Sequence, residues 1–163
     1  AAGGARSVTV VLGHEVDRMA ALLTGFDGKI TVNPDHAEGL ASSLRAGIAS
    51  LPSDSDGALL HLADMPGVTP EALRAMTVAF TRTGGQAIVR ATHGGKRGNP
   101  VILPRSVYSQ VARLTGDTGV LISSMPCKLF SRITMRTLRT KGDAGLCQSC
   151  IVVILYLNHS VFK

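Results

Sequence analysis

Short apolar runs alternate with segments of helical periodicity along the first two thirds of this chain. Between the runs, apolar side chains recur every three or four residues, as at Leu40, Leu44 and Ile48, which indicates helices with one buried face. Strands that alternate with helices predict an α/β domain, in which a mostly parallel sheet is covered by helices on both faces. The runs that we interpret as strands are residues 7–12, 29–33, 58–63, 86–91 and 100–103.

Residues that begin or end helices lie between these runs. Thr69 followed by Pro70 predicts a helix start, because threonine caps helix N-termini and proline is tolerated at the first helical position. Gly25 is expected to end an earlier helix. The glycine-rich, basic residues 93–99 are expected to form a loop between the last two strands, and a final helix is expected to end near Gly116.

Glycine, asparagine, aspartate and arginine follow the predicted strands where each strand ends. In open α/β sheets, ligands bind outside the carboxyl ends of the strands, so this edge is the predicted functional site. The segments that this rule selects are Gly13 and residues 33–39, 64–66 and 94–100.

The charge of the chain is unevenly distributed. The net charge is +6, but residues 1–120 carry 11 basic against 10 acidic side chains, whereas residues 121–163 carry 6 against 1. The basic run at residues 132–141 has no interleaved aromatic side chains that could stack on bases. We therefore expect no nucleic-acid partner.

The cysteines also lie in the last quarter of the chain, at positions 127, 147 and 150. An odd number of cysteines without a secretory signal is typical of a reducing cytoplasm, where we expect this protein to reside. The apolar run at residues 150–157 is too short to cross a bilayer as a helix, so no membrane partner is expected. A zinc site at Cys147, Cys150 and His159 is disfavoured, because the ligand set is incomplete.

Five short motifs follow one another over residues 6–119. They are Val-Leu-Gly-His (11–14), Asn-Pro (33–34) with Gly39 and Ser-Ser-Leu-Arg-Ala-Gly (42–47), Leu-Ala-Asp-Met-Pro (62–66), Lys-Arg-Gly-Asn-Pro-Val (96–101) and Leu-Thr-Gly-Asp-Thr-Gly (114–119). Each motif alone is weak, but the order and spacing together are specific. The series resembles the nucleotidyltransferases of molybdenum-cofactor maturation, the MobA-like NTP transferases, and is most similar to the molybdopterin cytidylyltransferases.

The resemblance implies a three-layer, Rossmann-like α/β fold and the transfer of CMP from CTP, or GMP from GTP, to molybdopterin. A molybdoenzyme or its chaperone would then receive the product. The implied cofactor is Mg²⁺, because nucleotidyl transfer needs a metal ion that neutralises charge as pyrophosphate leaves. A sugar- or alcohol-phosphate nucleotidyltransferase with the same fold is the alternative enzyme.

The resemblance also assigns roles to residues of the predicted edge. Asp64 is the implied catalytic residue and metal ligand, and its alternative role is to cap the turn after a strand. Arg97 would bind a phosphate as a bidentate donor, or would lie in a solvated loop. The implied nucleotide-binding residues are Gly13, Asn33, Gly39 and Ser43, and the last three have capping of the next helix as their alternative role. The implied substrate-binding residues are Arg97, Gly98, Asn99, Pro100 and Asp117.

Two departures from the family pattern predict that this chain is catalytically impaired. The family opens with a first strand and a glycine-rich phosphate loop, for which this sequence has no equivalent. It also has a second acidic metal ligand after the Gly-Asp-x-Gly motif, where only Asp143 remains here. We therefore divide the chain into an incomplete nucleotidyltransferase-like domain, residues 1–119, and an atypical C-terminal segment, residues 120–163, which is either native or frame-shifted. A non-catalytic nucleotide-binding or partner-binding fragment remains the alternative to an enzyme.

Overall fold

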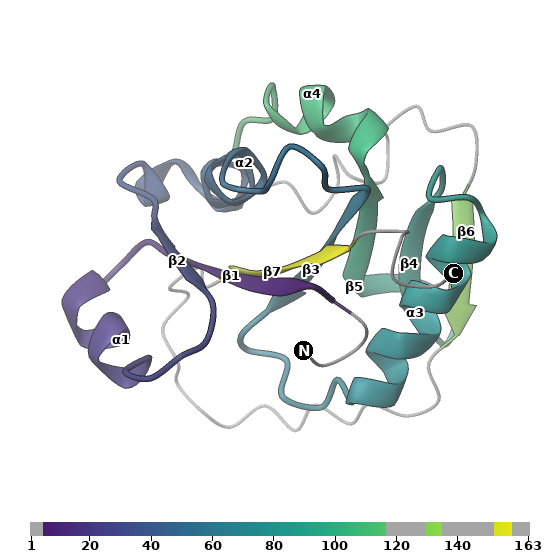
Figure 1. Cartoon of the computed structure of the whole chain (residues 1–163), viewed down its shortest axis with the longest axis horizontal. Helices are drawn as coiled ribbons and strands as arrows, with labels where there is room; N and C mark the ends of the chain where they lie inside the picture. The colour runs from purple at the N-terminus through teal and green to yellow at the C-terminus, as the bar shows by residue number, and fades with distance from the viewer. Residues whose placement is uncertain (1–4, 117–129, 135–151, 158–163) are drawn as a thin grey trace.

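A computed structural model describes residues 5–116, 130–134 and 152–157 of the chain. These residues form one seven-stranded sheet with helices on both faces (Figure 1). The fold is therefore the three-layer α/β arrangement that the alternation of strands and helices predicts. Among the described residues, no helix is long and apolar enough to cross a membrane.

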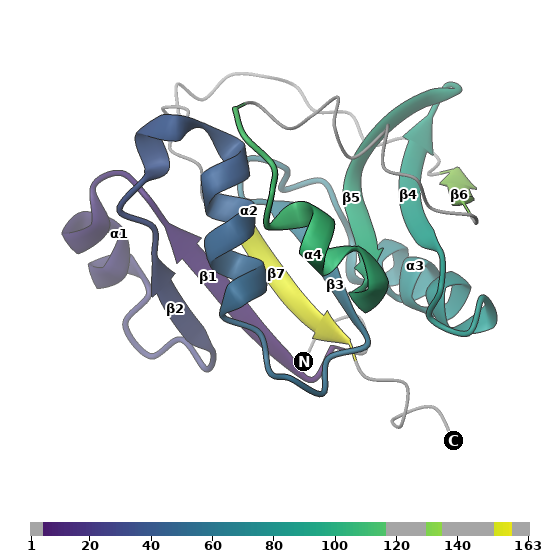
Figure 2. The same cartoon turned by 90° about the horizontal axis from the view of Figure 1, so that it is seen from above.

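The strand order in the sheet is β2-β1-β7-β3-β5-β4-β6. Strands β1, β2, β3, β4 and β6 run in one direction, whereas β5 and β7 run against them (Figure 2). Five of the seven strands thus run in the same direction, but because β5 and β7 lie between them, only the β1–β2 and β4–β6 pairs are parallel. The strands are β1 (Ser7–Leu12), β2 (Lys29–Val32), β3 (Gly57–Leu62), β4 (Ile88–His93), β5 (Lys96–Pro104), β6 (Phe130–Thr134) and β7 (Val152–Leu157).

The helices cover the two faces of the sheet in pairs. The α2 and α4 helices lie on one face, and α1 and α3 lie on the other (Figure 1). The helices are α1 (Val16–Leu22), α2 (Leu40–Ala49), α3 (Pro70–Arg82) and α4 (Tyr108–Val111), and short 3-10 turns cover His36–Glu38 and Arg105–Val107.

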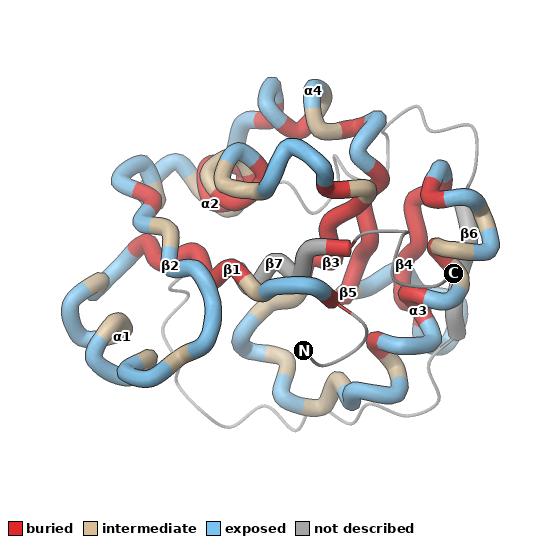
Figure 3. The backbone as a smooth tube through the Cα atoms, in the orientation of Figure 1, coloured by how far each residue is buried: buried red, intermediate tan, exposed pale blue. Residues whose placement is uncertain are grey.

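A separate apolar core fills the space on each side of the sheet. Val11, Leu60 and Val101 pack with α2 and α4 on one face. Leu59 and Ile102 pack with α3 on the other. Because successive strand residues point to opposite faces, neighbours such as Leu59 and Leu60 enter different cores. Strands β3 and β4 and the second half of β5 are accordingly the most buried part of the fold, and the β2–α1 end is largely exposed (Figure 3).

The predicted start of α3 is confirmed. The Thr69 side chain accepts a hydrogen bond from the backbone N–H of Ala72, at 3.3 Å, and Pro70 is the first helical residue. The apolar face of the helix, with Leu73, Met76 and Phe80 buried, packs against the sheet. Local sequence and tertiary packing thus agree on this element.

The loop expected over residues 93–99 is instead a tight hairpin, and this part of the prediction is wrong. Strand β5 begins at Lys96, and β4 and β5 pair antiparallel, with His93 opposite Lys96 and Thr92 opposite Arg97. Only Gly94 and Gly95 form the turn, with φ of 54° and 76°. Positive φ at both central residues is the geometry of a two-residue hairpin turn, which glycine adopts without steric cost.

Two strands of the C-terminal segment belong to the same sheet as the rest of the chain. Strand β6 pairs parallel with β4 at one edge. Strand β7 lies between β1 and β3 and pairs antiparallel with both. The division at residue 119 therefore stays a prediction, and these strands show that the described parts of both segments share one sheet.

Candidate functional site

The predicted site residues lie at one edge of the sheet. Gly13, Asn33 and Asp64 follow the carboxyl ends of β1, β2 and β3. Arg97 lies at the beginning of β5, and because β5 runs antiparallel, its beginning is at this same edge. Ligands of open α/β sheets bind outside this edge, so its geometry is that of a candidate active site. Asp117 lies outside the described residues.

Gly13 allows the β2–α2 connection to pass close to the end of β1. A Cβ atom at position 13 would lie 2.5 Å from the Cβ of His36, which is closer than such atoms approach in proteins. The His36 ring in turn lies 5.9 Å from the His14 ring, centroid to centroid. The role of Gly13 here is thus a close approach between two loops of the site. His36 lies 23 positions from Gly13 along the chain, so no local sequence pattern predicts this contact.

Asn33 holds the β2–α2 connection through a buried polar cluster. Its Nδ2 group donates to the Ser42 hydroxyl at 2.8 Å and to the Ser43 hydroxyl at 3.0 Å. Its Oδ1 atom accepts from the backbone N–H of Asp35 at 3.0 Å. Asn33 is only 2% exposed and Ser43 is fully buried. These hydrogen bonds fix the backbone of the connection in position, and Asp35 and Glu38 of the same connection are exposed.

Gly39 caps the N-terminus of α2 in a conformation that favours glycine. Its φ is 97°, in the left-handed region, and its carbonyl accepts from the Ser42 hydroxyl at 2.9 Å. Ser42 was absent from the predicted site, and the only signal for it was its place beside Ser43 in the second motif.

The described beginning of the fifth motif, residues 114–116, lies against the second motif, which includes residues 42–47. The backbone N–H of Ala41 donates to the carbonyl of Gly116 at 3.2 Å. Arg45 donates from Nη1 to the carbonyl of Leu114 at 2.5 Å and from Nη2 to the Glu38 carboxylate at 2.7 Å. Arg45 therefore joins two motifs that are about 70 residues apart in sequence, and this positioning role could not be read from either motif alone.

Asp64 presents an exposed carboxylate beyond β3. It lies in a turn closed by a hydrogen bond from the backbone N–H of Met65 to the carbonyl of Leu62, at 3.2 Å. His61, the penultimate residue of β3, is half-buried. Burial lowers the pKa of His61, and the Asp64 carboxylate opposes that shift. Burial therefore disfavours the charged form of the His61 ring.

The described residues fit a metal ion that arrives with phosphate ligands. They contain no group of three or more histidine, cysteine, aspartate or glutamate side chains that could enclose a metal by themselves. Mg²⁺ commonly binds proteins through only one or two carboxylates and takes its other ligands from water and substrate phosphates. The single carboxylate of Asp64 suits that mode of binding.

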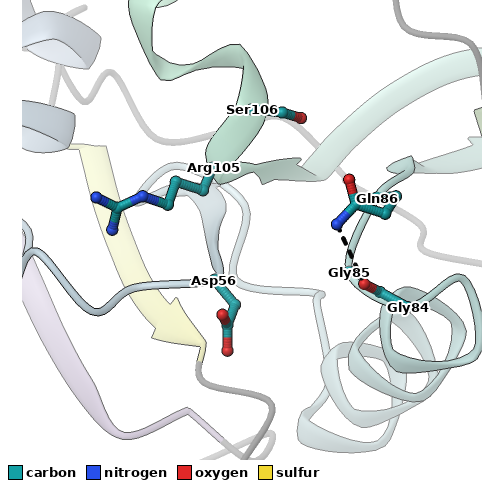
Figure 4. A pocket seen from close by; sticks show the side chains of 6 residues that line it. All are labelled: Asp56, Gly84, Gly85, Gln86, Arg105 and Ser106. Carbon is teal, nitrogen blue, oxygen red and sulfur yellow. Dashed lines mark hydrogen bonds between the residues drawn. The ribbon is translucent and has the colours of Figure 1, made fainter.

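A polar cavity of about 410 Å³ lies at the opposite edge of the sheet (Figure 4). It opens beside the beginning of β3 and the end of β5, where Arg105 donates to the carbonyls of Ser53 and Ser55. This edge carries none of the predicted site residues that the structure describes. The cavity is lined by Asp56, Gly84, Gly85, Gln86, Arg105 and Ser106.

The Asn33 cluster leads to a prediction on stability. Asn33→Ala removes the donor to two buried hydroxyls and the acceptor of the Asp35 N–H. Unsatisfied buried polar groups cost about 1–3 kcal/mol, so we expect the free energy of unfolding, measured in urea, to fall by about that amount. Thr24→Ala removes an exposed hydroxyl bonded to the nearby carbonyl of Ala21 and is the control, with an expected change below about 0.5 kcal/mol. Equal effects of the two substitutions would contradict a stabilising cluster at Asn33.

Comparison with known proteins identifies the family. The chain is similar to the crystal structure of Rv0371c from Mycobacterium tuberculosis H37Rv in complex with manganese, with a TM-score of 0.67, 25% identity, and coverage of 82% of this chain and 70% of that one. A second Rv0371c structure from that organism matches with a TM-score of 0.69, 26% identity, and coverage of 82% and 68%. The Rv0371c homologue from Mycobacterium sp. strain JC1 matches with a TM-score of 0.62, 27% identity, and coverage of 80% and 65%.

A search of curated proteins gave no match. The profile of the MobA-like NTP transferase domain matches residues 1–128, which is most of the chain and includes all five motifs. This chain therefore belongs to the MobA-like NTP transferase domain family.

Proposed function

We propose that this chain is a nucleotidyltransferase-type domain that binds CTP, or less favourably GTP, with a divalent metal ion, and acts on molybdopterin. The observation that carries the proposal is the position of Asp64 in a chain of this family. Its exposed carboxylate lies beyond β3, at the edge where Gly13 and Asn33 follow the ends of β1 and β2. The manganese complex of the similar mycobacterial protein supports a divalent metal ion, for which Mg²⁺ is our first choice.

Each part of the edge has a distinct task in this proposal. The connection fixed by Asn33 and Gly39 presents backbone groups to the nucleotide. Asp64 holds the metal ion, which would supply positive charge to the triphosphate as pyrophosphate leaves. Arg97, with Gly98, Asn99 and Pro100 beside it, binds the acceptor. Nucleotidyl transfer then depends on holding the acceptor phosphate in line with the α-phosphate, which is a matter of position more than of proton transfer.

Pyrophosphate release tests the proposal. The full chain is incubated with Mg²⁺, molybdopterin and either CTP or GTP, and pyrophosphate and the nucleotidylated pterin are measured. We expect release that requires the metal ion and molybdopterin and is faster with CTP. Metal-dependent binding of CTP without release would identify the alternative, a non-catalytic nucleotide-binding domain. Release that requires a sugar or alcohol phosphate instead of molybdopterin would overturn the acceptor assignment.

A further inference from the structure

Arg90 is a buried cation near the functional edge. It lies on β4, is 8% exposed, and shares the α2–α4 face of the sheet with Ile88, two residues earlier, and with Val101, directly opposite on β5. Burial lowers the pKa of Arg90, and the positive charge of Arg97 adds to that shift. A guanidinium nevertheless stays protonated in proteins, and a charge in surroundings of low dielectric constant acts over a longer range than one in water.

Arg97 lies across the hairpin from Arg90 and nearer to its turn. It is directly opposite Thr92, and residues directly opposite in an antiparallel pair point to the same face. Thr92 and Arg90 are two residues apart on β4 and also share a face. The register of the hairpin shifts between Arg90 and Thr92, because residues 98–100 of β5 lie opposite Ala91 alone, and the charge of Arg97 nevertheless acts on Arg90. Arg97 is exposed and forms no ion pair with any other residue that the structure describes, whereas Arg90 lies deeper in the same face.

We propose that Arg97 and Arg90 form a binding site for the phosphate group of the acceptor substrate, with Arg97 as the contacting residue and Arg90 as a buried positioning residue. Arg97 provides the planar fork that binds a phosphate in bidentate fashion at the surface. Arg90 adds a fixed positive charge beneath it. Two like charges on one face favour a dianion between or above them more than either arginine does alone.

The location on the sheet assigns this site to the acceptor and not to the nucleotide, an assignment that rests on the proposed function. Five strand spacings separate β4 from β2, where the Asn33 cluster lies, which corresponds to about 24 Å. Asp64, at the end of β3, lies between these two positions, only two strand spacings from β4. A metal ion held at Asp64 would therefore have the nucleotide on one side and the arginine pair on the other.

Binding of inorganic phosphate to the full chain, measured by titration calorimetry at constant ionic strength and without metal ions, tests the arginine pair. Arg97→Gln should weaken phosphate binding by roughly tenfold or more, since it removes a charge-assisted bidentate contact. Arg90→Met should weaken it by about tenfold, and Arg90→Lys, which keeps the charge, should restore most of the affinity. Lys96→Gln is the control: Lys96 is the adjacent exposed cation, but it faces the other side of the hairpin, opposite His93.

Thermal unfolding of each variant checks that it is folded. If Arg90→Met does not fold, the comparison of Arg97→Gln with Lys96→Gln still decides whether the site exists. Unchanged phosphate affinity in Arg97→Gln, or an equal loss in Lys96→Gln, would overturn the proposal, because the binding would then reflect general surface charge.

A second titration distinguishes the acceptor from the nucleotide. We expect saturating Mg²⁺ and CTP to leave phosphate binding intact and Arg97→Gln to leave CTP affinity unchanged. Competition between CTP and phosphate would assign the arginine pair to the triphosphate and overturn the acceptor assignment. If the chain binds phosphate but does not bind CTP, the proposed function is contradicted and the phosphate site at the arginine pair still stands.

Discussion

Replacement of Asp64 by asparagine is expected to weaken metal-dependent binding of CTP by roughly 100-fold or more, and pyrophosphate release with it. The substitution keeps the size of the side chain and removes the negative charge that would hold the metal ion beside the triphosphate. Because Asp64 is exposed and its side chain forms no ion pair among the described residues, the free energy of unfolding should change by less than about 0.5 kcal/mol.

The control for this experiment is Asp27→Asn. Asp27 is also exposed but precedes β2, at the opposite edge of the sheet from Asp64. Its substitution should leave the CTP affinity in the presence of Mg²⁺ unchanged, and both variants should bind CTP equally weakly in EDTA. A CTP affinity that is the same in Asp64→Asn and in the unmodified chain would remove Asp64 from the metal site and leave it only the role of a turn residue.

The second large effect concerns the core. Phe80→Ala is expected to lower the free energy of unfolding by about 3–5 kcal/mol, which is the usual cost of deleting a buried phenylalanine ring. Phe80 is 3% exposed and packs in the core between α3 and the sheet. Its ring also lies against Gly57 at the beginning of β3, where an added Cβ would be 2.5 Å from Cζ. Domains are stable by only about 5–15 kcal/mol, so much of this margin would be lost.

Urea unfolding followed by circular dichroism measures this change. Val78→Ala, on the same helix at a residue that is 43% exposed, removes apolar atoms from the surface instead of the core and is the matched control. It should change the free energy of unfolding by less than about 0.5 kcal/mol. A loss below about 1 kcal/mol for Phe80→Ala would contradict the packing of α3 on the sheet.

Elements whose signals are local could be predicted from the sequence. Strand β1 has the predicted bounds, Ser7–Leu12, because its apolar, β-branched run ends sharply at Gly13. Helix α3 begins where Thr69 and Pro70 predict it, since capping involves residues only three positions apart. The edge that carries the site followed from the same alternation, because the carboxyl ends of parallel strands lie together.

Features that depend on distant residues could not be predicted. The place of β7 between β1 and β3 depends on pairing across 90 residues or more, and an apolar run does not specify its neighbours. The glycine-rich, basic sequence at the beginning of β5 predicts a loop, since lysine and glycine are poor strand formers, whereas the Gly94–Gly95 turn and the pairing with β4 determine its structure.

The same limit applied to the site. The roles of Asn33 and Ser43 were predicted as contacts with a nucleotide, and the motif could not reveal that these side chains bond to each other. Arg90 was part of a run interpreted only as a buried strand. Its place on the same face of the hairpin as Arg97 depends on the register of the hairpin, which composition and periodicity do not determine.

The central claim is that a nucleotide binds with a metal ion at the carboxyl edge of the sheet, and amide chemical-shift mapping of the labelled full chain tests it most directly. CTP is added with Mg²⁺ and again with EDTA. We predict metal-dependent shifts at Gly13, Gly39 and Asp64, with little change at the opposite edge. Shifts that cluster instead around the cavity at Gly85 and Arg105, or that are the same in EDTA, would contradict this account.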